Sequence, residues 1–226
     1  ALPAELVTRI EDAAANLEPQ KHENLYARLF GTDSFDLYEE NGNWREQEKK
    51  LAERRQAAIQ DLLHQEDLAA VIAFATDVES PFHVGFALGS IGSSEIDTSL
   101  LPSCLGNEEK ANQEFLQGYL WSRHQKEGWQ WVDQHDRSSW SVDQNCRMLI
   151  YLPFCHETWD RAARWLGDSE PLYWARTYAN PYQAEGDIST AVAKLLEAKR
   201  PVRAIDCLNT MLHNKLPLDP RQVVQA

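Results

Sequence analysis

Residues 71–89, VIAFATDVESPFHVGFALG, can be aligned with residues 149–167, LIYLPFCHETWDRAARWLG, at an offset of 78 residues. Each stretch reads as an apolar helix, a break with an acidic residue, and an amphipathic helix that ends in Leu-Gly. Gly89 and Gly167 are expected to form left-handed caps at these ends. Residues 161–167 also match residues 203–209, 42 residues later, where Asn209 replaces the glycine. Offsets of about 40 residues are typical of helix-pair repeats.

The composition favours helix over sheet. Leu and Ala, which favour helices, number 51 together. Val and Ile, which favour strands, number only 18. From residue 44 to residue 64 the apolar side chains form one stripe, which predicts a long amphipathic helix. We therefore predict an all-α fold of stacked antiparallel helix pairs, a right-handed α-solenoid with a longer helix near the N-terminus.

The predicted organisation has two parts. Residues 1–65 form an N-terminal helical segment that contains the helix at 44–64. Residues 66–226 form a continuous array of helix pairs at about 66–106, 107–140, 141–183 and 184–226, with Gly128 as a break inside the second pair. The alternative is a single irregular helical bundle. Asp219-Pro220 is typical of a helix start, with an acidic N-cap before proline.

Residues 188–220, ISTAVAKLLEAKRPVRAIDCLNTMLHNKLPLDP, resemble a tetratricopeptide-type unit. Ala191 and Ala204 are small residues where two helices would cross, Leu195 and Leu208 would fill the groove, and Pro217 follows the second helix. The Trp-Leu-Gly-Tyr signature of the first helix is absent, and the spacing exceeds the usual value of about 34 residues. Residues 66–226 more broadly resemble irregular TPR-like or HEAT-like segments of large bacterial proteins. The resemblance implies a scaffold or recognition surface rather than a catalytic centre.

The net charge limits the classes of partner that the chain can bind, and the cysteines indicate its cellular compartment. The 35 Asp and Glu residues against 22 Lys and Arg give a net charge of −13, which argues against a nucleic-acid-binding surface over the whole molecule. No apolar run approaches the length of a membrane span, and no export signal is recognisable. Four cysteines, at 104, 146, 155 and 207, lack CxxC spacing. We expect buried, reduced thiols in a cytoplasmic protein without cofactor or metal.

Two polar clusters could carry chemistry. Asp133, His135 and Asp136 offer ligand types that divalent metals accept, but adjacent positions do not share a helix face, so a solvated loop is the preferred interpretation. Cys155-His156-Glu157 sits at a break before a helix, where a structural role at the helix N-terminus is preferred over a cysteine nucleophile. No HExxH, GxSxG, GxGxxG or P-loop motif occurs in the sequence.

Aromatic residues are concentrated between positions 119 and 182, and most of them are expected in the core. The others are candidates for a protein interface, because Trp and Tyr often anchor interfaces. We select Trp129, Trp131, Trp140, Tyr178 and Tyr182 as partner-binding residues.

We therefore predict a non-enzymatic helical scaffold or recognition segment of a larger bacterial cytoplasmic protein. It would bind a protein partner or another domain of its own protein. One alternative is a small enzyme or metal-binding domain that uses Asp133, His135 and Asp136, with Cys155 or His156. The other is a structural spacer.

Overall fold

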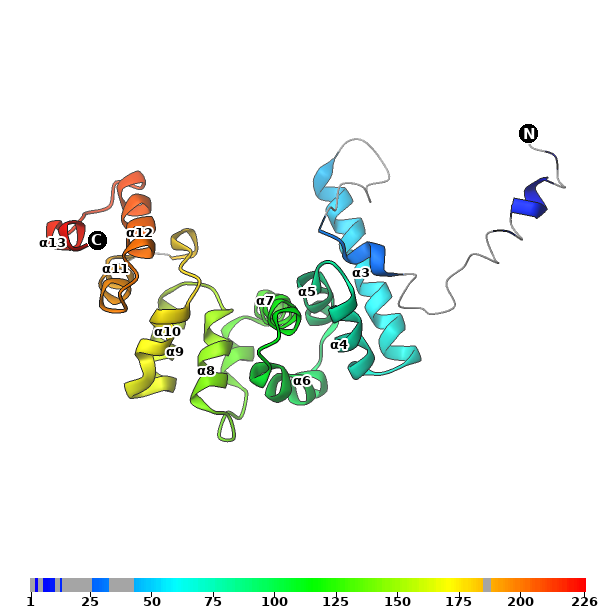
Figure 1. Cartoon of the computed structure of the whole chain (residues 1–226), viewed down its shortest axis with the longest axis horizontal. Helices are drawn as coiled ribbons and strands as arrows, with labels where there is room; N and C mark the ends of the chain where they lie inside the picture. Colours follow the sequence, from blue (N-terminus) through cyan, green and yellow to red (C-terminus); the bar gives the residue numbers. More distant parts are fainter. Residues whose placement is uncertain (1–2, 4–5, 11–12, 14–25, 33–42, 185–187) are drawn as a thin grey trace. The chain divides into compact units, whose positions relative to one another are not determined.

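The computed structural model describes residues 3, 6–10, 13, 26–32, 43–184 and 188–226. Within these ranges every regular element is a helix (Figure 1). This confirms the predicted all-α class, whereas the stacked right-handed array of helix pairs stays a prediction. The chain forms two compact units, residues 1–91 with 109–119 and residues 92–108 with 120–226.

The first unit contains the long helix that the sequence predicts near the N-terminus. Its described elements are η1 (Ala27–Phe30), α3 (Trp44–Gln65), α4 (Leu68–Asp77), α5 (Pro81–Ile91) and the first ten residues of α7 (Lys110–Asp133). α3 confirms the predicted helix at 44–64, and Leu51, Ile59 and Leu62 of its apolar stripe are buried. α3 contacts both α4 and α5, and the three helices lie in the same compact unit.

The second unit contains the remaining elements. They are α6 (Ser94–Gly106), the rest of α7, α8 (Val142–Ile150), α9 (His156–Leu166), η3 (Gly167–Ser169), α10 (Glu170–Arg176), η4 (Pro181–Gln183), α11 (Ile188–Glu197), α12 (Pro201–His213) and α13 (Pro220–Gln225). Gly128 interrupts α7 with φ of 68°, as the sequence predicts. α13 begins after Asp219, whose side chain accepts a hydrogen bond from the backbone N–H of Arg221 and forms the predicted cap.

The predicted glycine and asparagine caps are correct at one position of three. Gly167 ends α9 with φ of 52°. Gly89 and Asn209 instead lie inside α5 and α12, so their predicted caps are wrong. The reason is that glycine and asparagine permit a left-handed turn without forcing one, and packing extends both helices past them.

A buried ion pair holds α6 against the second part of α7, defined as residues 120–133. The Asp97 carboxylate accepts hydrogen bonds from Arg123 at Nε (3.1 Å) and Nη2 (2.8 Å). It also accepts one from Trp131 Nε1 at 2.9 Å. Asp97 and Arg123 are each 2% exposed. Because unpaired charges are costly to bury, these bonds fix the two helices relative to each other.

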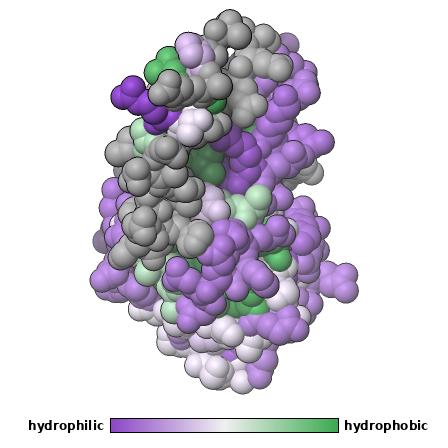
Figure 2. Space-filling view, turned by 90° about the vertical axis from the view of Figure 1, so that its right-hand side faces the viewer, coloured by the Kyte–Doolittle hydropathy of each residue, from purple (hydrophilic) through white to green (hydrophobic). Residues whose placement is uncertain are grey.

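The described residues contain no helix long and apolar enough to cross a membrane. The face of the molecule in Figure 2 is mostly hydrophilic, with small separate apolar areas. This pattern agrees with the content of charged residues, which make up 25% of the chain.

Two glycines let α5 and the first part of α7 approach closely. A Cβ on Gly85 would lie 1.8 Å from the Phe115 carbonyl oxygen, and a Cβ on Gly118 would lie 2.1 Å from the Phe82 carbonyl oxygen. Both obstacles are backbone atoms, so a side chain can be accommodated only if one helix shifts.

Gly85→Ala is therefore expected to lower the free energy of unfolding by about 1–3 kcal/mol despite the higher helix propensity of alanine. Urea denaturation followed by circular dichroism measures this change. Gly106→Ala is the control, because its Cβ would meet only Gln144 Nε2, at 3.6 Å. An equal effect of the two substitutions would contradict the close contact.

His83 in α5 is half-buried in a groove of about 330 Å³ between α3 and α5. Burial lowers the pKa of His83 from 6.5 to about 4, and the charge of Arg55 adds to this effect. As pH falls from 6.5 towards 4, the unfolded chain therefore binds the proton before the folded chain does. Folding stability contributed by the neutral imidazole is present above pH 6.5 and is lost through this range.

His83→Gln is expected to reduce the loss of stability between pH 7 and pH 5 by about 1 kcal/mol, after allowance for the partial exposure of the ring. The measurement is urea denaturation of both proteins at the two pH values. His124 and His135, whose pKa values are also lowered by burial, remain in the variant and leave part of the pH dependence. Identical pH dependence in the two proteins would show that His83 titrates normally.

Candidate protein-interaction site

The connection that follows α10, defined as residues 177–184, is held in place at its start by Arg200. This residue precedes α12, and its Nη1 donates to the carbonyl oxygens of Thr177 (2.6 Å) and Trp174 (3.1 Å). Carbonyls in the last turn of a helix have no partner within that helix, so the guanidinium satisfies groups at the end of α10. The connection therefore leaves α10 in a fixed direction.

The next residues form the short helix η4. Asn180 is extended, as expected before proline, and its side chain accepts a hydrogen bond from the Tyr182 N–H at 3.2 Å. Gln183 Oε1 accepts a hydrogen bond from the Phe154 N–H at 3.0 Å, which joins η4 to the segment before α9. Local capping and this longer-range contact together place Tyr178 and Tyr182 beside α12.

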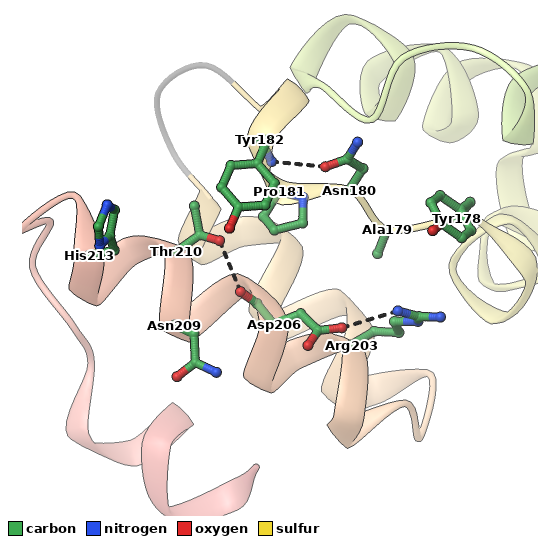
Figure 3. A pocket seen from close by; sticks show the side chains of 10 residues that line it. All are labelled: Tyr178, Ala179, Asn180, Pro181, Tyr182, Arg203, Asp206, Asn209, Thr210 and His213. Carbon is green, nitrogen blue, oxygen red and sulfur yellow. Dashed lines mark hydrogen bonds and ion pairs between the residues drawn. The ribbon is translucent and has the colours of Figure 1, made fainter. Parts of the chain in front are cut away.

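A pocket of about 530 Å³ lies between this connection and α12 (Figure 3). Its lining residues are Tyr178, Ala179, Asn180, Pro181, Tyr182, Arg203, Asp206, Asn209, Thr210 and His213. Arg203 Nη1 binds Asp206 Oδ2 at 3.1 Å, and the Arg203 guanidinium lies 5.5 Å from the centre of the Tyr178 ring. The two tyrosines come from one side of the pocket and the charged pair from the other.

Several groups on this pocket have unused hydrogen-bonding capacity. Tyr178 and Tyr182 are 69% and 84% exposed. Within the described part of the chain, neither tyrosine hydroxyl makes a hydrogen bond, and the same holds for the Asn209 amide and the His213 imidazole. The site thus offers two large rings together with donors and acceptors that another molecule can satisfy.

The side chains of α12 form three stripes along the helix, one buried, one polar and one exposed and apolar. Ala204, Cys207, Leu208 and Met211 are buried. A polar stripe of Arg203, Asp206, Thr210 and His213 lines the pocket. A third stripe, which contains Val202, Ile205 and Leu212, is exposed. The last two stripes each follow the i, i+3, i+10 spacing of one helix face.

The five aromatic residues predicted to bind a partner lie in three different environments. Tyr178 and Tyr182 line the pocket. Trp131 is 1% exposed and donates its indole N–H to Asp97, so it belongs to the core and presents no ring surface to a partner. The sequence indicates that Trp129 and Trp131 lie on different sides of their segment. It does not indicate which of the two is buried.

Trp129 and Trp140 are half-buried beside cationic and imidazole groups. The Trp129 ring lies 4.2 Å from the Arg161 guanidinium and 4.4 Å from the His124 ring centre. Trp140 stacks on His135 at 6.2 Å. Both rings therefore already have partners within the protein, so the tyrosine pocket is the better candidate.

The three residues of the predicted metal-binding alternative have separate partners. Asp133 binds Arg161 through two hydrogen bonds of 2.9 and 2.5 Å, and the Arg161 guanidinium lowers the pKa of this carboxyl. His135 lies between Trp131 and Trp140. Asp136 accepts a hydrogen bond from the Ser138 N–H at 3.0 Å. The structure does not bring these side chains to a common point.

Cys155 and His156 also have separate environments. Cys155 is the buried residue before α9, and burial raises the pKa of its thiol. His156 is exposed, and its Nδ1 lies 3.2 Å from Asp160 Oδ2. Among the residues that the structure describes, no cluster of three His, Cys, Asp or Glu side chains could hold a metal ion.

All four cysteines are buried with free thiols, as small apolar side chains are expected to be. Burial raises the pKa of Cys104 to about 11 and that of Cys207 to about 12. Both thiols therefore stay protonated at neutral pH.

The sequence interpretation missed the contribution of α12 to the pocket. Arg203, Asp206 and His213 are distant from Tyr178 and Tyr182 in the sequence, and only the hairpin of α11 and α12 brings them together. The available signal was the polar stripe on α12, because its spacing places these residues on one face.

Comparisons with protein-family models, with curated proteins and with solved structures found no match to this chain.

Trp131→Ala is expected to lower the free energy of unfolding by about 3–5 kcal/mol, because it leaves a cavity and removes a donor from the buried Asp97 carboxylate. Tyr182→Ala, at an exposed ring, is expected to change it by no more than about 0.5 kcal/mol. Urea denaturation compares the two variants. Similar values for both would contradict the assignment of Trp131 to the core and Tyr182 to the surface.

Proposed function

We propose that this chain is a non-enzymatic recognition segment of a cytoplasmic protein. In this proposal the pocket between η4 and α12 binds a protein partner or another domain of the same protein. The observation that carries the proposal is the pair of exposed tyrosines, Tyr178 and Tyr182, beside a pocket with unused polar groups. The free thiols of the four cysteines are in keeping with a reducing compartment.

The chemistry of the pocket suits a protein ligand. Tyrosine rings contribute large contact areas at a small cost in side-chain entropy, and they are enriched among the residues that dominate binding energies. Asn209 provides both a donor and an acceptor, as a peptide backbone requires. The charged pair Arg203 and Asp206 lies at the same pocket and can select among polar partners.

The site is also preorganised. Arg200 fixes the end of α10, Asn180 caps η4, and Gln183 joins η4 to Phe154. A connection that is already ordered loses less conformational entropy when a partner binds. The tyrosines are therefore presented by a fixed backbone rather than by a loop that must first become ordered.

The test is capture of partners by the immobilised chain, with the captured proteins quantified by mass spectrometry. We expect Tyr178→Ala/Tyr182→Ala to reduce capture of a specific partner at least tenfold, since each anchoring ring contributes about 1–2 kcal/mol or more. Trp44→Ala is the matched control, because Trp44 is an aromatic residue with 55% exposure in the first unit.

The melting temperature of each variant is measured in parallel and is expected to stay unchanged. Equal loss of capture in the Trp44 variant would indicate nonspecific adhesion to exposed aromatic rings. Absence of any partner that depends on the tyrosines, with a folded wild-type chain, would contradict the proposal and favour the structural spacer.

A further inference from the structure

The outer face of α12, defined as Val202, Ile205 and Leu212, is an exposed apolar surface. These side chains are 69%, 41% and 64% exposed. Their spacing places them on one side of the helix, together with the exposed Asn209, which also lines the pocket. Exposed apolar residues that occur singly are ordinary, whereas several on one helix face mark a contact surface.

Equivalent positions in α9 are not apolar. In the alignment at an offset of 42 residues, Val202 and Ile205 correspond to Asp160 and Ala163. Both residues of α9 are also exposed, but one is charged and the other is small. A helix face that stays in water needs no large apolar residues, so α12 differs from α9 in the way expected of a covered face.

The positions of α5 that align with Val202 and Ile205 are covered by another helix. At a further offset of 78 residues the counterparts of Val202 and Ile205 are Phe82 and Gly85. In the first unit these positions meet α7, whose residues Phe115 and Gly118 approach their backbone closely. A helix therefore packs on this face of α5. The larger side chains of α12 suit an ordinary separation of about 8–10 Å between helix axes.

Two lysines in unusual backbone conformations lie just before and just after α12. Lys199 and Lys215 have φ of 57° and 56°, in the left-handed region that favours glycine. Each follows a helix end, where the next N–H bonds back to Leu195 or Met211 at 2.9 Å. Both lysines are exposed and form no ion pair within the described residues. The fold itself would accept glycine at either position.

The C-terminal segment that contains the outer face has a positive net charge although the chain as a whole is acidic. Residues 188–226 contain six Lys and Arg against three Asp and Glu, whereas the whole chain has a net charge of −13. The lysines lie just outside the 13 residues of α12, which span about 20 Å along the helix axis. Exposed apolar residues on a helix with a cation beyond each end complement an apolar strip with anions at its ends.

We propose that the outer face of α12 binds an amphipathic α-helix that carries acidic residues at both ends of its apolar strip. Val202, Ile205 and Leu212 pack against the apolar side of that helix, and Lys199 and Lys215 pair with its carboxylates. The occupant is a helix because the contact surface is itself one helix face, as on α5, and offers no strand edge. The surface does not include Tyr178 or Tyr182, so substitutions of its apolar residues test it separately from the proposed tyrosine pocket.

The experiment uses the full chain and a fluorescein-labelled peptide of about 17 residues, with Leu on one helix face and Glu at both ends. Fluorescence anisotropy measures binding at low and high salt. A second peptide has the same composition in an order that destroys the apolar face. We expect the amphipathic peptide to bind at least tenfold more tightly than the second peptide.

The first variant tests the apolar contact. Val202→Ser/Ile205→Ser/Leu212→Ser is expected to weaken binding of the amphipathic peptide at least tenfold. Val142→Ser/Leu172→Ser removes exposed apolar side chains of α8 and α10 and serves as the matched control, with binding unchanged. Circular dichroism and melting temperature establish that both variants fold.

The second variant separates recognition from structure. Lys199→Gly/Lys215→Gly is expected to weaken binding several-fold and to reduce its salt dependence, while the melting temperature stays equal or rises because glycine suits the left-handed conformation. Lys199→Arg/Lys215→Arg is expected to retain binding. A purely structural role of the lysines predicts the opposite, a lower melting temperature with unchanged binding.

Three results would overturn the proposal. The first is equal binding of the two peptides, and the second is unchanged binding to the serine variant. The third is a wild-type dimer by light scattering that dissociates in the serine variant, which would assign the face to a second copy of the chain.

Discussion

The buried guanidinium of Arg123 is the constraint on which the second unit depends. A cation with 2% exposure must have its donors satisfied, and Asp97, Glu127 and the Gly92 carbonyl oxygen provide the acceptors. The indole of Trp131 also takes part in this cluster. Its N–H donates to the Asp97 carboxylate, and its ring lies 5.3 Å from the Arg123 guanidinium. α6 and the second part of α7 can therefore adopt only one relative position.

Further arginines extend this arrangement along the unit towards the pocket. Arg147 of α8 donates to the Asn107 carbonyl oxygen at the end of α6, at 2.7 Å. Arg161 of α9 binds Asp133 at the end of α7. Arg200 binds the carbonyl oxygens at the end of α10. Arg147 and Arg200 satisfy carbonyl oxygens that a helix end leaves without partners, and Arg161 pairs with the side chain of the last residue of α7. The directions of successive helices are therefore fixed by hydrogen bonds as well as by apolar packing.

α12 shows how one helix serves three purposes. Its buried stripe packs on α11, its polar stripe lines the tyrosine pocket, and its outer face is left in water. These three stripes fill the whole circumference of the helix. The tyrosine pocket and the outer face are adjacent but share no side chain that the two proposals require, so one partner or two can use the helix.

Local patterns in the sequence determined the helical class, the long helix α3, the break at Gly128 and the start of α13 at Asp219-Pro220. Each depends on propensity, periodicity or capping among neighbouring residues. The caps at Gly89 and Asn209 were predicted wrongly, because tertiary packing decides whether a permissive residue ends a helix. Only the tertiary structure decided which aromatic residues are buried. Trp131 is buried because Asp97, 34 residues away, accepts its N–H. Tyr182 stays exposed, and it lies beside α12 because the fold brings residues 203–213 next to it. Local patterns carry no information about such contacts between distant residues.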